Sequence, residues 1–325
     1  MSQILSFEEA IRVSGTNVRS VLLGNGFSIA QAGGQFSYKS LLDFSGLPED
    51  DPIRNVFNVL ETFDFEKVME ALEDASHIEA AYEDKDRAKR FRDDAARVRE
   101  ALITAVHTVH PGVRFDIPQA QRDACAAFLR RFEAVFTLNY DLLLYWVILH
   151  GAQDKFTDGF GHGDTVDGFR TFDLGAPCST YYLHGALHLF LSAKLDTQKR
   201  ILTKNTIIED IAATIRQRTQ LPLFVAEGTA TQKIARIRSI PYLTYCYEQL
   251  SDVRGSLFIF GHAASDNDAH LYDAICCSGV EMVFVFVHKP DENLDTMREQ
   301  LAKYTARRED IEWLYVDAAT AKVWG

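Results

Sequence analysis

The stretch SVLLGNGFSIA, residues 20–30, opens with a short apolar run and breaks off into glycine, asparagine and glycine. A continuous apolar run of this length is typical of a strand that is buried on both faces of a parallel sheet. Glycine and asparagine are ordinary turn residues, but glycines also let the backbone come close to a phosphate group at the start of a helix. The stretch therefore predicts a buried strand that leads into either a simple turn or an anion-binding turn.

Five further segments have a similar apolar, β-branched or aromatic character. They are residues 134–139, 180–185, 256–261, 282–288 and 311–316, with 180–185 and 311–316 the weaker candidates. Helical patterns lie between them, for example in residues 266–279 and 294–310. Strands that alternate with helices predict the α/β class, with a doubly wound, mostly parallel, Rossmann-like sheet.

The chain is predicted to form a single domain of residues 1–325 with a helical insertion at residues 51–118. The insertion is rich in Ala, Glu, Arg and Lys, and apolar residues recur in it every three or four positions. Its charges predict a solvated outer face, while its apolar stripe must cover the sheet or another protein. Residues 192–220 predict a second, mostly helical connecting segment.

Composition narrows the classes of partner. The net charge of −12 leaves no basic excess for binding nucleic acid or an anionic membrane surface. The N-terminal residues lack the pattern of a signal peptide, and the longest apolar stretches are far shorter than the roughly 20 residues that span a bilayer. We therefore expect a cytoplasmic protein whose partners are small molecules and other proteins.

The five cysteines and ten histidines show no metal-binding spacing. The sequence has no Cys-x-x-Cys pair, and no His-x-x-x-His pair falls on a predicted helix. We expect all five cysteines to be buried thiols in a reducing compartment, and we expect no metal site.

The first glycine-rich turn consists of Gly24, Asn25, Gly26, Phe27 and Ser28. It follows a predicted strand and opens a predicted helix, where free backbone N–H groups and the helix dipole favour an anion. As a dinucleotide fingerprint the turn is a poor match, because Ile29 stands where the third glycine belongs. A structural turn without a ligand remains the alternative.

Three other motifs also lie at predicted strand ends. Asn139 can donate and accept hydrogen bonds, which suits a ribose hydroxyl or a water, and Asp141 suits a carboxamide N–H, although both could simply cap the next helix. His184 could act as a general base, although a lone histidine can also be structural. Gly261 and Asp268 repeat the layout of strand, glycine, polar turn and helix. Because strand ends of one sheet share an edge, we expect these side chains to meet in one crevice.

The order of these motifs resembles that of sirtuin-like domains. The glycine-rich turn, the NYD strand end, the HG pair and Gly261 with the DAHL element (268–271) follow one another as in the diverged sirtuin-like NAD hydrolases of bacterial antiphage defence, including the Thoeris effector. Residues 221–250 are also similar to the family segment that joins the histidine to the last glycine motif. The resemblance covers nearly the whole chain outside the helical insertion.

The resemblance implies a sirtuin-like domain that cleaves NAD+ to ADP-ribose and nicotinamide, with NAD as substrate and no metal. Residues 24–28 would line the diphosphate, and Gly261 and Asp268 would border the adenosine half. Asn139 and Asp141 would hold the nicotinamide ribose and carboxamide, and His184 would be the general base. Loss of Asn139 or His184 would then abolish cleavage.

Unrestrained NAD hydrolysis would kill a cell, so the resemblance also implies a triggered effector of antiphage defence, with abortive infection as its outcome. We expect restraint by a separate regulatory or sensor protein, by homo-oligomerisation, or by both. The chain departs from protein-deacetylating sirtuins, because it lacks their zinc-binding cysteines, and Ala263 stands where the family often has serine. A sirtuin-like ADP-ribosyl transferase or deacylase and a non-catalytic nucleotide-binding sensor or scaffold remain the alternatives.

Overall fold

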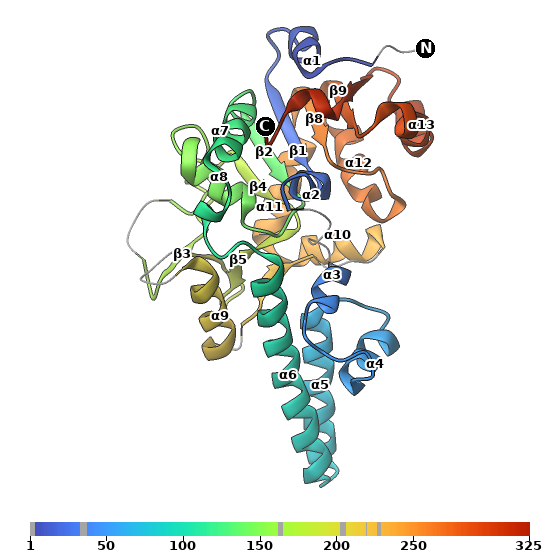
Figure 1. The fold of residues 1–325 in the computed structure, drawn as a ribbon. Coiled ribbons are helices and arrows are strands. Elements are labelled where there is room, and N and C mark those ends of the chain that lie inside the picture. The colour runs from blue at the N-terminus through green and yellow to red at the C-terminus, as the bar shows by residue number, and fades with distance from the viewer. Residues whose placement is uncertain (1–3, 33–37, 162–164, 202–205, 219, 226–228) are drawn as a thin grey trace.

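A six-stranded parallel sheet forms the centre of the computed structural model, which describes residues 4–32, 38–161, 165–201, 206–218, 220–225 and 229–325 (Figure 1). Its strands are β1 (Arg19–Leu23), β2 (Ala134–Thr137), β4 (Thr180–Tyr182), β8 (Arg254–Phe260), β9 (Gly279–Val287) and β10 (Glu312–Asp317). Their order is β10-β9-β8-β1-β2-β4, and every neighbouring pair is parallel. All six predicted strand segments are therefore confirmed, including the two weaker ones.

This strand order is that of the Rossmann sheet, with the first strand in the middle and the chain winding outward in both directions. The direction of winding reverses between β1 and β8. Open α/β sheets bind ligands outside the carboxyl ends of the strands at such a reversal. We therefore expect a ligand site at the edge formed by the carboxyl ends of β1, β2, β4 and β8.

Helices cover both faces of this sheet. On one face, Phe258 contacts Phe7 of α1 and Phe260 contacts Phe128 of α7, with ring centroids 6.4 and 5.8 Å apart. Ile259, which points to the opposite face, is also fully buried. The helices around the sheet are α1 (Phe7–Val13), α2 (Asn25–Ala32), α7 (Gln119–Leu129), α8 (Leu143–Gly151), α10 (Ala230–Ser239), α11 (Pro241–Ser251), α12 (Ala269–Cys277) and α13 (Pro290–Arg307).

The insertion between α2 and α7 consists mainly of helices. They are α3 (Tyr38–Asp43), α4 (Pro52–Val59), α5 (Phe65–Ala81), α6 (Lys85–Val109) and the short 3-10 helix η1 (Arg114–Asp116). Asp64 and Asp84 cap α5 and α6 by accepting hydrogen bonds from first-turn amides. In Figure 1 these two helices form an antiparallel pair that extends away from the body of the molecule.

A second, four-stranded antiparallel sheet lies beside the first. Its order is β3-β6-β5-β7, with β3 (Phe169–Thr171), β5 (Gly185–Leu191), β6 (Thr197–Arg200) and β7 (Pro222–Phe224), and helix α9 (Ile207–Arg218) follows β6. The prediction that residues 192–220 are mostly helical is therefore wrong for their first part. The sequence of β6, TQKR, has no apolar run, and it becomes a strand because it pairs with β5 and β3.

One expectation about the cysteines is also wrong. Cys125, Cys246 and Cys276 are buried as expected, but Cys178 is partly exposed and Cys277, in the last turn of α12, is exposed.

Among the helices of the described residues, none combines the length and the apolar character that a membrane span requires.

The last residues of the chain pack on the first glycine-rich turn. After the 3-10 helix η3 (Ala318–Ala321), Trp324 stacks obliquely on Phe27 of α2, with ring centroids 5.0 Å apart. Its indole N–H donates to the carbonyl of Phe27 at 2.8 Å. Trp324 therefore stabilises the start of α2 through both a ring contact and a hydrogen bond.

Candidate functional site

The glycine turns that follow β1 and β8 interlock. The amide of Gly24 donates to the carbonyl of Phe260 at 2.8 Å, and that of Gly26 donates to Gly261 at 2.7 Å. A Cβ atom on Gly24 or Gly26 would come within 2.6 Å of the backbone of Gly261, which has a φ of +69°. Glycine is thus required at all three positions for the two turns to touch. The amides of Gly24 and Gly26 already donate hydrogen bonds within the protein. The contact of these residues with a diphosphate remains a prediction.

Asn139 is attached to the first of these turns. Its side-chain Nδ2 donates to the carbonyl of Gly24 at 2.9 Å, and its own amide is bonded to Thr137 Oγ1. The side chain is almost fully buried. The end of β2 and the glycine turn after β1 therefore form one unit, as their positions in the sequence predicted.

Asp141 is held between α2 and α8. Ser28 donates its hydroxyl to Oδ2 at 2.5 Å, and the amide of Leu143, at the start of α8, donates to Oδ1 at 2.8 Å. Burial raises the pKa of Asp141 to about 6, although both hydrogen bonds oppose this shift. Asp141 thus supports the first turn of α8, which was the alternative to its ligand role, and its contact with a carboxamide stays a prediction.

His184 lies just beyond the end of β4 and faces a second histidine. Its Nε2 is 3.2 Å from Nε2 of His270, in the first turn of α12. The ring centroids are 5.4 Å apart, so the two nitrogens meet along the line that joins the rings. Burial lowers the pKa of His184 well below its usual range and that of His270 to about 4. Both rings are therefore neutral at neutral pH and share one proton between their Nε2 atoms.

The carboxylate of Asp268 lies beside this pair and contacts one lysine and one further histidine. Lys233 of α10 donates to Oδ1 at 2.7 Å, and Nε2 of His262 is 3.2 Å from Oδ2. Burial would raise the pKa of Asp268, but the hydrogen bond from His262 and the positive charge of Lys233 outweigh it and hold the pKa well below its usual range. An ionised carboxylate can only accept a hydrogen bond, so Nε2 of His262 donates to Asp268. The other ring nitrogen of His262, Nδ1, lies 3.0 Å from the hydroxyl of Tyr272.

His262 connects the histidine cluster to the glycine turns. It follows Gly261 directly, and its Cβ lies 2.7 Å from the point where a Cβ on Gly24 would be. Asn139, Gly24, His262, Asp268 and His184 therefore belong to one continuous set of neighbours at the carboxyl ends of β1, β2, β4 and β8. The predicted convergence of the four motifs is present in the structure.

The glycine after His184 sets the path of the chain there. Gly185 has a φ of +78°, and a Cβ on it would lie 1.9 Å from the carbonyl oxygen of Leu223 in β7. Only glycine allows β5 to approach β7 this closely. The HG pair thus places His184 at the junction between the parallel and the antiparallel sheets.

The histidine cluster also contains a set of side chains that could bind a metal ion. His184, His270 and Asp268 each offer one ligand atom, and these atoms lie within 4.8 Å of one another. Two imidazoles and a carboxylate are ligands that zinc accepts. The ammonium of Lys233 on Asp268 and the direct contact of the two Nε2 atoms favour proton sharing instead. The absence of a metal requirement stays a prediction.

Sequence reasoning did not assign three members of the cluster. His270 belongs to the DAHL element and His262 follows a glycine of the last motif, so the sequence carried a signal for both. Lys233 lies in the polar helix α10, 35 positions before Asp268, and the resemblance over residues 221–250 assigns it no role.

Three comparisons place the chain among known proteins. A family model described as "Domain of unknown function (DUF4917)" matches residues 21–324. No curated protein matches the chain. Among solved structures, it is similar to the one titled "Structure of Sir2Tm bound to a propionylated peptide", with 14% identity and a TM-score of 0.34, covering 92% of this chain and 98% of that chain. A likeness of this size assigns neither an activity nor a ligand.

Proposed function

The chain belongs to the DUF4917 family, whose description states no activity, and we propose from its site that the protein is an NAD+ glycohydrolase that releases nicotinamide and ADP-ribose. The observation that carries the proposal is the meeting of His184, Asn139 and two glycine turns at the reversal point of a Rossmann-ordered sheet. Dinucleotides bind to such sheets at this place. The order of the motifs, which resembles that of sirtuin-like NAD hydrolases, supports NAD as the substrate.

The chemistry needs little from the protein beyond positioning and a base. Nicotinamide leaves NAD+ as a neutral molecule, so its departure requires no strong acid. In the proposed mechanism Asn139, which donates to the carbonyl of Gly24, orients the ribose or the attacking water. His184 then takes the proton from a ribose hydroxyl or from that water.

The ring of His184 is in the neutral form that a general base needs, although burial also makes it a weaker base. The ring is neutral because burial lowers its pKa, and Nδ1 has no hydrogen-bond partner among the described residues. A proton accepted at Nδ1 leaves Nε2 free to donate to His270. The ionised carboxylate of Asp268 favours the resulting imidazolium, since its charge raises the pKa of His184 against the effect of burial.

We further infer that the activity is restrained in the cell until a trigger arrives, as in an antiphage effector that acts by abortive infection. Unrestrained hydrolysis would deplete the NAD+ of the cell. The α5–α6 pair, which extends from the body, offers a surface to a separate regulatory protein or to a second copy of the chain (Figure 1).

The direct test follows nicotinamide release by chromatography. Purified protein, alone and together with the products of neighbouring genes, is incubated with NAD+. His184→Ala and Asn139→Ala are compared with the wild type and with His288→Ala, a matched control that changes an exposed histidine outside the proposed site and outside the α5–α6 pair. We expect the control to keep the wild-type rate and the two site variants to lose at least about a hundredfold.

Two other outcomes would overturn the proposal. Equal background release by the wild type and both site variants under every condition would exclude catalysis. If the wild type then binds NAD+ in calorimetry without cleaving it, the protein is a nucleotide-binding sensor or scaffold. Transfer of ADP-ribose to a protein, or deacylation of an acyl-lysine peptide, would identify a transferase or deacylase.

A further inference from the structure

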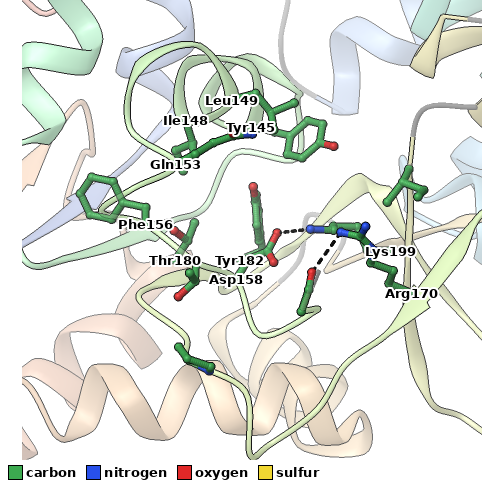
Figure 2. A pocket seen from close by; sticks show the side chains of 14 residues that line it. Tyr145, Ile148, Leu149, Gln153, Phe156, Asp158, Arg170, Thr180, Tyr182 and Lys199 are labelled. Atoms are coloured by element: carbon green, nitrogen blue, oxygen red, sulfur yellow. Dashed lines mark hydrogen bonds and ion pairs between the residues drawn. The ribbon is translucent and has the colours of Figure 1, made fainter. Parts of the chain in front are cut away.

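A cavity of about 350 Å³ lies between α8 and the antiparallel sheet (Figure 2). Its volume is within the range of small-molecule pockets in proteins. The described residues that line it include none of the predicted site residues. The cavity is therefore separate from the candidate NAD site.

The walls of the cavity are mainly aromatic and aliphatic. Tyr145 and Leu149 of α8 face Tyr182 of β4 across the space. His188 packs on both tyrosines, with ring centroids 4.6 Å from Tyr145 in a stacked arrangement and 5.1 Å from Tyr182 edge-on. Because these contacts fix both rings, a flat apolar group would find a preformed slot here.

The charged side chains of the lining already have partners within the protein. Lys199 donates to Asp158 at 2.6 Å, and its ammonium lies 5.8 Å from the ring centroid of Tyr145. Arg170 donates to the carbonyl of Gly161 at 3.0 Å. Burying a charged ligand beside groups that are already paired costs desolvation and forms no new ion pair. The lining therefore favours a neutral ligand.

The hydroxyl of Tyr182 is the polar group that a ligand could satisfy. The residue is only 1% exposed, and its hydroxyl has no hydrogen-bond partner among the described residues. In Figure 2 the hydroxyl end of the side chain points across the cavity toward α8. Burial, together with the negative charge of Asp158, raises the pKa of Tyr182 well above its usual range, so the group keeps its proton. It can therefore donate a hydrogen bond to an acceptor in the cavity.

We propose that this cavity is a second binding site, which takes a small, neutral, flat aromatic molecule that carries a hydrogen-bond acceptor, such as a ring nitrogen or a carbonyl. The aromatic body lies against Tyr145 and Leu149, and the acceptor receives the hydrogen bond from Tyr182. The proposal does not depend on NAD hydrolysis, because it rests on the contacts of this cavity alone.

The test compares quinoline with naphthalene, which has the same shape but no ring nitrogen. Both are titrated into the full chain without NAD+, at slightly alkaline pH where quinoline is uncharged, and binding is followed by ligand-observed NMR. We expect quinoline to bind saturably at a single site. Tyr182→Phe removes only the hydroxyl, and we expect it to weaken quinoline about fivefold, which corresponds to about 1 kcal/mol for one neutral hydrogen bond. The affinity of naphthalene should be the same in the variant and the wild type.

Two further variants and a charged ligand locate and characterise the binding. Tyr82→Phe makes the same substitution at an exposed tyrosine at the end of α5, and it should leave both affinities unchanged. Leu149→Trp should abolish the binding of both compounds by filling the cavity. The anion 2-naphthoate should bind more weakly than quinoline, because the ionic groups of the lining are already paired. Thermal melts confirm that each variant is folded.

Four results would overturn the proposal: no saturable binding of quinoline, wild-type affinity for quinoline in Tyr182→Phe, an equal loss of naphthalene affinity in that variant, or tighter binding of 2-naphthoate than of quinoline. Displacement of quinoline by excess ADP-ribose would also overturn it, since quinoline would then occupy the candidate NAD site. A protein that binds quinoline in this way but never cleaves NAD+ would support this inference and refute only the proposed function.

Discussion

His184 and His270 meet through their Nε2 atoms at 3.2 Å, although 86 positions separate them in the sequence. The first follows β4, and the second lies in the helix after β8. The contact therefore spans the reversal point of the sheet and fixes the orientation of the proposed base.

His270 is expected to act as a positioning residue for His184. We expect His270→Leu to lower kcat for NAD+ cleavage at least about tenfold with little change in KM, because a misoriented base loses part of its 10²- to 10⁴-fold contribution. His270→Gln, which can still hydrogen bond to Nε2, should recover part of the rate. Steady-state kinetics of both variants check this.

A purely structural role for His270 gives a different pattern. In that case the leucine and glutamine variants would lose thermal stability in parallel with activity, and KM would change together with kcat. The variant His288→Ala, which changes an exposed histidine, again serves as the control.

The histidine cluster is expected to work without a metal. We expect dialysis against EDTA to leave NAD+ cleavage unchanged, because Lys233 already neutralises Asp268 and His270 already engages His184. Elemental analysis of the purified protein checks the metal content. A stoichiometric divalent ion whose removal stops the reaction would instead identify His184, His270 and Asp268 as ligands.

The interlocked glycine turns are expected to tolerate no side chain. Gly261→Ala would place a Cβ 2.6 Å from the amide nitrogen of Phe27 in a left-handed backbone conformation, and we expect it to cost about 3 kcal/mol or more. The control is Gly161→Ala, because Gly161 has a similar φ of +61° but no atom of a described residue within 4 Å of an added Cβ, so we expect only backbone strain of about 1–2 kcal/mol. Denaturant unfolding of both variants measures the difference. Equal losses would show that the close approach of the turns contributes nothing.

His188 is expected to make the protein sensitive to acid. Burial lowers the pKa of His188 to about 3, and both of its ring nitrogens are buried without a partner among the described residues. Because the unfolded state takes up a proton near pH 6.5 and the folded state does not, stability falls as the pH drops below that value. His188→Leu has no such proton uptake, so its stability advantage over the wild type should grow by about 2 kcal/mol between pH 7 and pH 5.

Unfolding in urea at both pH values measures this advantage for His188→Leu. A stability difference that stays constant with pH would mean that the imidazole is protonated as readily in the folded protein as in the unfolded chain.

Much of the central sheet could be predicted from the sequence because its strands are buried on both faces. Segments such as residues 282–288 must then be apolar throughout, and that signal is local. The convergence of the candidate site residues could be predicted for a related reason, since Asn139 and His184 directly follow such strands. The α/β alternation predicted a doubly wound, parallel sheet, but no local signal in the sequence fixed the order of its strands.

The parts that were missed depend on distant contacts. Strand β6 reads TQKR, and Lys199 is buried there only because Asp158, 41 positions earlier, pairs with it. Lys233 reaches Asp268 from α10, a helix in which the sequence indicated no site residue. The glycines of the first turn were visible in the sequence, but the partner that requires them, Gly261, lies more than two hundred positions later.

The bond from Trp324 to the carbonyl of Phe27 joins residues 297 positions apart. During translation Phe27 is made long before Trp324, so the start of α2 lacks this support until residue 324 has been synthesised. The first glycine-rich turn therefore reaches its final packing late, after the strands on both sides of β1 in the sheet have been made.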